Sequence, residues 1–247
     1  MPPLVLTFAA SDPTGGAGLQ ADLLTLAALG CHPLSVLTGF TVQDTSGVEL
    51  LEAMPAALVA RQARMLLAES KVAAFKVGVL GSAENARAVA AIAAEHPNVP
   101  LVLDPVLASG RGDRLATEDL PGALLESLVP RATVATPNTL EAAGLGGRQR
   151  LLDLGCRYVL VTGTHDETPE VINRLYDARG LVREDRWTRL PGSYHGSGCT
   201  LASAIAAALA KGRNVPEAVR EAQQFTWRAL AEGFRTGAGQ SLPNRFH

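Results

Sequence analysis

Lysine, aromatic residues and charge of either sign are scarce in this chain of 247 residues. Only three of its 22 basic residues are lysines, and they are isolated from one another: Lys71, Lys76 and Lys211. The formal net charge is −2 and charged residues make up 19% of the chain. Nucleic-acid binding depends on a clustered basic surface, so we expect no nucleic-acid partner. A hydrophobic fraction of 47% with so little charge excludes a disordered chain.

Signals for secretion, membrane insertion and zinc binding are also missing. No Lys or Arg precedes Arg61, although a secretory signal starts with a basic segment. The apolar run 23–42 is interrupted by Gly-Cys-His-Pro at 30–33, which favours a helix, a turn and a strand over a membrane span. The three cysteines show neither a Cys-x-x-Cys pair nor zinc-ligand spacing; they are Cys31, Cys156 and Cys199. We therefore expect a soluble cytoplasmic protein with no membrane partner.

What the sequence does contain is a regular alternation of short apolar runs and longer Ala- and Leu-rich segments of helical period. Near-continuous apolar strands are typical of a parallel sheet covered by helices on both faces. The expected strands are 4–9, 34–42, 75–79, 101–104, 133–136 and 158–161, followed by an edge hairpin of 171–177 and 183–190. The expected helices are 17–29, 55–69, 83–95, 120–128, 199–211 and 216–234. This pattern predicts one doubly wound α/β domain over residues 1–247, with its ligand site at the carboxyl ends of the strands.

Two glycine-rich segments lie where such a site is expected. Residues 10–22 contain Gly16-x-Gly18-x-x-Ala21 at a strand-to-helix turn, but Asp-Pro-Thr separates the glycines from the strand, which disfavours a dinucleotide-binding oxidoreductase. Residues 194–200, YHGSGCT, lead into a helix whose first N–H groups can cradle a phosphate. Cys199 lies at that helix start, where a thiol pKa tends to fall, although packing alone also explains a small buried thiol there. No Gly-x-x-x-x-Gly-Lys-Ser/Thr is present, so a P-loop is excluded.

Three further polar positions follow strands. Asp104 ends the apolar run 101–104 and precedes a proline. Asn138 and Glu141 have the spacing of a helix capping box, and the same carboxylate would suit a magnesium ion. Gln43 offers an amide suited to the edge of a heterocycle, or is simply an exposed loop residue.

Taken in order, these segments resemble the hydroxymethylpyrimidine/phosphomethylpyrimidine kinases of thiamine biosynthesis, which have the ribokinase-like fold, a three-layer α/β/α sandwich. The matching stretches run from residue 4 to about residue 211, and the two glycine-rich stretches are the most specific in combination. They read AASDPTGGAGLQADL, GFTVQDTSGV, FKVGVL, VLDPV, SGRGDRL, TPNTLEAAGL, VLVTGTH and HGSGCTLASAIAAALAKG.

The resemblance implies an ATP- and Mg²⁺-dependent kinase that phosphorylates 4-amino-5-hydroxymethyl-2-methylpyrimidine and then its monophosphate, and that forms a homodimer. It implies catalytic roles for Cys199, Gly198 and Gly196, and metal or phosphate roles for Asp104 and Glu141. The pyrimidine is expected to be bound by Gln43, Asp22, Val79 and Ala10. The nucleotide is expected to be bound by Asn138, Thr162 and Arg111.

The sequence departs from the family at several of these positions. Ala10 replaces a glycine and Val79 a methionine, and Thr162 stands where the family has a lysine facing the ATP phosphates. The segment between Glu141 and Tyr158 is also short, and Arg111 or Arg114 is expected to replace the missing cation. Two alternatives stay open. One is a pyridoxal kinase of the same fold, since pyridoxine-type rings also carry a hydroxymethyl group. The other, suggested by Thr162 and the short segment, is a pyrimidine-binding protein with weakened kinase activity.

Overall fold

The structure is a computed structural model that describes residues 1–108, 112 and 115–247. Its centre is one nine-stranded sheet with the strand order β3-β2-β1-β4-β5-β6-β7-β8-β9. The six strands from β2 to β7 in that order pair in parallel, and β3, β8 and β9 are antiparallel to their neighbours. The strands are β1 (Leu4–Ser11), β2 (His32–Gln43), β3 (Val48–Ala53), β4 (Ala74–Val77), β5 (Leu101–Leu103), β6 (Val134–Ala135), β7 (Tyr158–Val161), β8 (Glu170–Asp177) and β9 (Gly180–Thr188).

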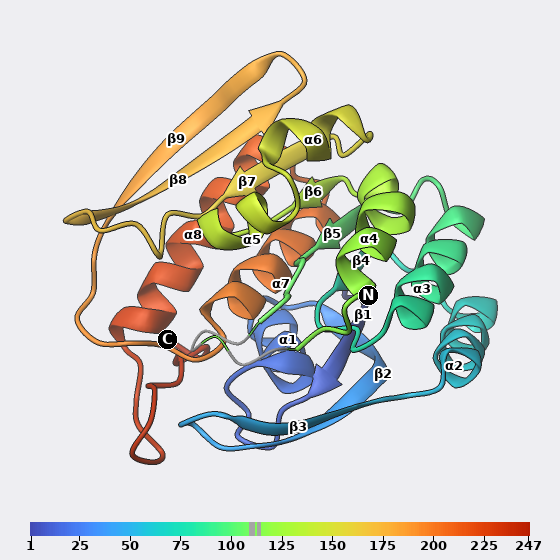
Figure 1. Ribbon diagram of the computed structural model, residues 1–247, viewed down its shortest axis with the longest axis horizontal. Coiled ribbons are helices and arrows are strands. Elements are labelled where there is room, and N and C mark those ends of the chain that lie inside the picture. The colour runs from blue at the N-terminus through green and yellow to red at the C-terminus, as the bar shows by residue number, and fades with distance from the viewer. Residues whose placement is uncertain (109–111, 113–114) are drawn as a thin grey trace.

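Helices cover both faces of this sheet, as the apolar strands predict (Figure 1). On one face lie α1 (Gly18–Ala28), α7 (Ser197–Ala210) and α8 (Val215–Ala231). On the other lie α2 (Ala56–Glu69), α3 (Ala83–Glu95) and α4 (Leu120–Ala123), which continues through η1 (Leu124–Leu128) and η2 (Val129–Arg131). Two short helices, α5 (Thr139–Gly144) and α6 (Arg148–Asp153), lie between β6 and β7 in the chain.

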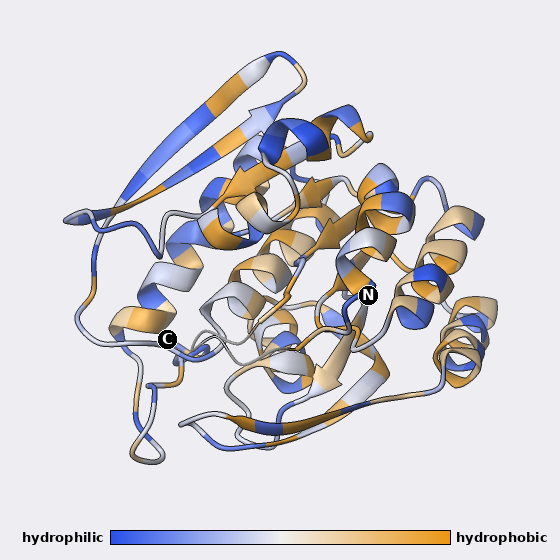
Figure 2. Cartoon of the chain, viewed as in Figure 1, coloured by the Kyte–Doolittle hydropathy of each residue, from blue (hydrophilic) through white to orange (hydrophobic). Residues whose placement is uncertain are grey.

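Successive strand residues separate into the two cores, because side chains alternate across a sheet. Val5, Val102 and Leu160 pack under α1, α7 and α8, whereas Leu6 and Leu103 pack under α2 and α3. Figure 2 shows these central strands as largely apolar and the β8–β9 hairpin as mainly hydrophilic. The hairpin extends the sheet at its edge, as the sequence predicts.

The boundaries of the helices and strands largely agree with those predicted from the sequence, and the differences concern single short elements. The expected helix 17–29 is α1, and the expected helix 199–211 is α7. Two elements were not predicted from the sequence: β3, which pairs with β2, and the short helix α6. Within the described part of the chain, no helix has the length and apolar character needed to cross a membrane.

Candidate active site

A cavity of about 470 Å³ opens along the carboxyl ends of the strands. Its wall follows the strand order across the sheet: Gln43 ends β2, Ala10 lies near the end of β1, and Val79 follows β4. Asp104 follows β5, Thr136 follows β6 and Thr162 follows β7, and β8 and β9 supply the far end. Because neighbouring strands are ~5 Å apart, this order makes the cavity a long trough with two ends. We call the part at β2, β1 and β4 the acceptor end and the part at β7, β8 and β9 the donor end.

The start of α7 lies between the two ends, and the HGSGC motif forms it. Gly196 precedes the helix in a left-handed conformation, with φ +81°. A Cβ atom there would lie 1.8 Å from the carbonyl oxygen of Gly16, so only glycine fits. Gly198 is exposed to the cavity, and a Cβ atom built on it would lie 3.8 Å from Asp104 Oδ2. The start of this 14-residue helix, with its unpaired first N–H groups, therefore lies beside the carboxylate of Asp104.

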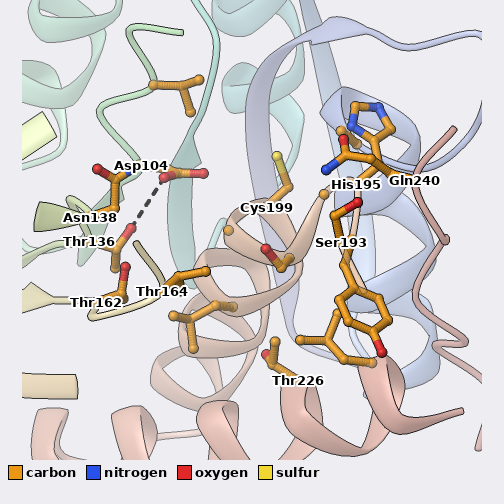
Figure 3. Close-up of a pocket in the computed structure, with 18 of the residues that line it drawn as sticks. Asp104, Thr136, Asn138, Thr162, Thr164, Ser193, His195, Cys199, Thr226 and Gln240 are labelled. Atoms are coloured by element: carbon orange, nitrogen blue, oxygen red, sulfur yellow. Dashed lines mark hydrogen bonds between the residues drawn. The ribbon is translucent and has the colours of Figure 1, made fainter. Parts of the chain in front are cut away.

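Cys199 is the next residue, and its thiol is almost wholly buried (8% exposed). In Figure 3 it lies between Asp104 on one side and His195 on the other. Burial raises the pKa of the Cys199 thiol to about 12, and the positive charge of Lys76 and the N–H of Gly18 only partly oppose this. The expectation that the helix start lowers this pKa is therefore wrong, because desolvation outweighs the helix dipole.

Asp12, which was not among the predicted site residues, connects the two glycine-rich segments through its side-chain contacts. Asp12 Oδ2 lies 2.8 Å from His195 Nε2 and accepts from the backbone N–H of Ala17 at 2.6 Å. Burial alone would raise the pKa of Asp12, but the hydrogen bonds from His195, Ala17 and Thr14 outweigh it and hold the pKa well below its usual range. His195 is thus a loop-bonding residue here. The Asp-Pro-Thr-Gly sequence is the signal that points to such a turn, because Asp side chains often bond the backbone two residues on.

Arg245 secures the same segments from the C-terminal side. It is 4% exposed and donates to the carbonyl oxygens of Gly15 and Gly16 and to Thr200 Oγ1. Nothing in the sequence around Arg245 indicates this role, because the contact joins residues about 230 positions apart.

The prediction that Asp22 binds the pyrimidine is wrong. It is wholly buried and does not line the cavity, so it makes no direct contact with a ligand there. Its carboxylate binds Lys76 Nζ at 2.7 Å and accepts from Thr7 Oγ1 at 2.5 Å and Ser203 Oγ at 2.8 Å. Burial disfavours the charged ammonium, but the Asp22 carboxylate outweighs it and keeps the pKa of Lys76 above its usual value. The pair is a satisfied buried ion pair beneath the site, which joins α1, β4 and α7.

Asp104 and Glu141 come close enough to influence each other. Asp104 is 4% exposed; its Oδ1 lies 3.4 Å from Thr136 Oγ1, and its Oδ2 has no hydrogen-bond partner among the described residues. Burial and the neighbouring carboxylate raise the pKa of Glu141. Burial raises the pKa of Asp104 as well, against the opposing charge of Lys76. The predicted capping box is confirmed: Asn138 accepts from the Glu141 N–H at 2.8 Å, and Glu141 accepts from the Asn138 N–H at 3.0 Å.

The other expected site residues divide between the two ends. Gln43, Val79 and Ala10 all line the acceptor end, where the Ala10 N–H donates to the Val79 carbonyl at 3.0 Å. Asn138 and Thr162 lie side by side at the donor end, joined by a β-bridge. Arg111 and Arg114 lie outside the described residues.

The donor end contains a basic side chain that was not predicted from the sequence, that of Arg189. Among the described residues, Arg189 is the only Arg or Lys on the cavity wall. Its guanidinium donates to four carbonyl oxygens of the loop after β7, those of Gly163, Thr164, Asp166 and Thr168, at 2.7–3.4 Å. Arg189 therefore fixes that loop and brings positive charge to the donor end.

Known proteins resemble this chain over almost its whole length. The family model described as phosphomethylpyrimidine kinase matches residues 12–244. The chain belongs to the phosphomethylpyrimidine kinase family. It is 41% identical to the hydroxymethylpyrimidine/phosphomethylpyrimidine kinase of Streptomyces coelicolor, over 96% of this chain and 92% of that one. The family expected from the motifs is thereby confirmed.

Solved structures of two types of kinase are similar to this chain. The ADP complex of Bacillus subtilis pyridoxal kinase superposes with a TM-score of 0.89 at 28% identity, covering 99% of this chain and 98% of that one. The phosphomethylpyrimidine kinase of Clostridium difficile superposes with a TM-score of 0.78 at 30% identity, covering 91% of this chain and 97% of that one. The backbone agrees well with both types of kinase, which confirms the ribokinase-like fold expected from the motifs.

Proposed function

We propose that this protein transfers a phosphoryl group from ATP to the hydroxymethyl group of 4-amino-5-hydroxymethyl-2-methylpyrimidine, and then a second one to the resulting monophosphate. One observation carries the proposal: a single trough holds Gln43 at one end, Thr162 at the other, and the start of α7 between them. Phosphoryl transfer needs two ligands placed in line across an anion cradle, and little covalent chemistry from the protein.

The acceptor end suits a small aromatic ring. Val79 and Ala10 are buried and, with Leu115, form a small apolar cluster, and Gln43 places its amide at the same wall. An amide both donates and accepts, which matches the amino group and ring nitrogen of an aminopyrimidine. The hydroxymethyl group would then point towards Gly198 and Cys199.

The centre of the trough supports transfer of the group itself. The N–H groups at the start of α7, around Gly196 and Gly198, would hold the phosphoryl oxygens as negative charge develops. Cys199 would take the proton of the attacking hydroxyl. Since its pKa is raised, only a small thiolate fraction exists at neutral pH, and the rate should rise as that fraction grows.

Asp104 and Glu141 are the residues that fit a magnesium ion. Asp104 Oδ2 is buried with no hydrogen-bond partner among the described residues, and a cation would relieve the repulsion between two neighbouring carboxylates whose pKa values are raised. The described residues contain no cluster of three or more acidic, His or Cys side chains that would cage a metal alone. Magnesium in kinases is commonly held by one or two carboxylates together with the nucleotide phosphates, so two carboxylates suffice. The ion would neutralise phosphate charge during transfer.

The direct test is product formation. The protein would be incubated with MgATP and either hydroxymethylpyrimidine, its monophosphate or pyridoxal, and the products separated by chromatography. We expect phosphorylation of both pyrimidines, with a higher kcat/KM for hydroxymethylpyrimidine than for pyridoxal. Faster turnover of pyridoxal would instead support the second candidate, a pyridoxal kinase, which the TM-score of 0.89 to the Bacillus subtilis enzyme favours. Pyrimidine binding without product would support a binding protein with weakened activity.

We also propose a homodimer that functions in the cytoplasm. Phe40, Val42 and Leu50 are each more than 40% exposed on β2 and β3, and Val42 pairs directly with Leu50. A second copy packing on these strands would cover them, and light scattering of wild type and Val42→Lys would test this. The cytoplasmic location is supported by three cysteines that are all free.

A further inference from the structure

The only two tryptophans of the chain lie together at the donor end of the trough. Trp187 is in β9 and Trp227 is in α8, and their ring centroids are 6.4 Å apart with an interplanar angle of 29°. Both side chains are half-buried and both line the cavity. Two large aromatic rings partly open to a cavity are not explained by core packing, which would cover them.

Hydrogen bonds fix the orientation of both rings. The Trp187 indole N–H donates to Gln223 Oε1 at 3.0 Å, and the Trp227 indole N–H donates to the carbonyl oxygen of Thr188 at 3.0 Å. Gln223 is itself 3% exposed, and its amide N–H donates to Asp185 at 2.8 Å. The polar edges of both indoles are therefore satisfied within the protein, and apolar ring surface is what they offer to the cavity.

The tryptophan pair is also connected to the loop that follows β7. Asn173 Nδ2 donates to Gln223 Oε1 at 2.8 Å, and the Gly163 N–H donates to Asn173 Oδ1 at 3.1 Å. Gly163 lies between Thr162 and Thr164, both of which line the trough. Because β9 is two strands from β7, Trp187 lies ~10 Å across the sheet from this loop, and Trp227 on α8 stacks on Trp187. A ligand that spans the donor end thus meets polar groups near the centre and aromatic rings further out.

We propose that Trp187 and Trp227 form a stacking platform for the base of the nucleotide that donates the phosphoryl group. The ligand class is a nucleoside di- or triphosphate: a flat aromatic base over the indoles, with its phosphates reaching past Thr162 towards the start of α7. Base–aromatic stacking is strong and tolerates any base, because every base has a π-face. Gln223 acts as the positioning residue that links the platform to the Gly163 loop. This inference rests on the proposed kinase function.

Intrinsic fluorescence gives a direct test, since all tryptophan emission of this chain comes from the platform. The full-length protein would be titrated with MgADP, which binds without reaction, and with inorganic tripolyphosphate, which has the phosphates but no base. We expect MgADP to quench the emission and tripolyphosphate to leave it nearly unchanged. Unchanged emission at an MgADP concentration that calorimetry shows to be saturating would overturn the platform.

Substitutions of the two tryptophans test the stacking platform through the affinity for MgADP. We expect Trp187→Leu and Trp227→Leu to weaken MgADP binding about fivefold to 150-fold by calorimetry, with Trp→Phe at each position recovering part of the loss. Hydroxymethylpyrimidine and tripolyphosphate affinities should stay unchanged, which also shows that the variants are folded. If both Leu variants bind MgADP as wild type does, the platform is overturned while the kinase function stands. A wild-type protein that neither binds MgADP nor forms product would overturn both.

Discussion

The acceptor end and the donor end of the trough are built in different ways. The acceptor end rests on β1, β2 and β4, and side-chain contacts of Asp12, His195 and Arg245 bind the loop after β1 to the start of α7. The donor end rests on β7 and the β8–β9 hairpin, and its loop is held by Arg189 through backbone carbonyl oxygens. Fixed side-chain contacts suit selection of one small ring. A wall of stacked indoles and backbone oxygens suits a ligand that most kinases share, so we expect substrate choice to be decided at the acceptor end.

The largest expected effect is a loss of kcat on substitution of Cys199, which lies between the two ends. Replacing Cys199 with Ala should lower kcat about 10²- to 10⁴-fold, the usual range for loss of a general base, and leave binding at both ends intact. In wild type, kcat should rise with pH through neutrality, because the raised pKa keeps most of the thiol protonated there. Steady-state kinetics against pH would measure both effects.

Cys31→Ala is the matched control, since Cys31 is a buried free thiol in the core beneath α1 and does not line the cavity. It should retain full activity and the same pH profile. Normal turnover in Cys199→Ala would return Cys199 to a packing role.

A smaller effect, a loss of pyrimidine affinity, is expected for a substitution at the acceptor end. Gln43→Ala leaves the polar edge of the ring unmatched, so pyrimidine binding should weaken by ~1–3 kcal/mol while MgADP binding stays the same. Isothermal titration calorimetry with hydroxymethylpyrimidine and with MgADP would measure the two affinities separately. Gln62→Ala, an amide on α2 outside the cavity, should change neither affinity. Equal losses for both ligands would show that the two ends are not separate.

The donor end can be tested by restoring a cation. Thr162 supplies a hydroxyl but no charge, and Arg189 already directs four of its five N–H groups to carbonyl oxygens. Thr162→Lys should therefore raise kcat/KM for MgATP, since a charged contact is worth ~1.5–3 kcal/mol, and leave the KM for pyrimidine unchanged.

Thr162→Ser serves as the neutral control and should resemble wild type. No gain in Thr162→Lys, with a large loss in Arg111→Ala or Arg114→Ala, would instead assign the phosphate charge to one of those arginines. No effect in any of them would place phosphate neutralisation elsewhere in the protein.

The residues show what a sequence can and cannot predict about such a site. The alternation of apolar strands and helices predicts the layers. The positions after strands predict that Gln43, Asp104 and Asn138 share one site, because parallel strands end at one edge, and all three line the trough. The thiol pKa and the burial of Asp22 were not predictable, since both depend on desolvation by residues distant in the chain. Contacts such as Arg245 with Gly16, or Trp187 with Trp227, carry no local pattern and become visible only when the fold brings them together.

The smallest expected effect concerns the carboxylates between the two ends. In the folded protein the pKa values of Asp104 and Glu141 are raised above those of the unfolded chain. The folded state therefore binds protons more tightly, so this contribution to stability is complete at low pH and is lost as pH rises through the raised values. Between about pH 5 and about pH 8 the melting temperature without Mg²⁺ should fall, by ~2–4 °C for each kcal/mol lost.

Magnesium should reverse this loss, because it binds the ionised carboxylates of the folded state alone. Its stabilising effect in differential scanning calorimetry should be larger at about pH 8 than at about pH 5. Asp104→Asn should remove most of the magnesium-dependent rise, while Asp153→Asn, on α6 outside the trough, should keep it. A magnesium effect that is equal at both pH values, or unchanged in Asp104→Asn, would show that the metal binds through the nucleotide without these carboxylates.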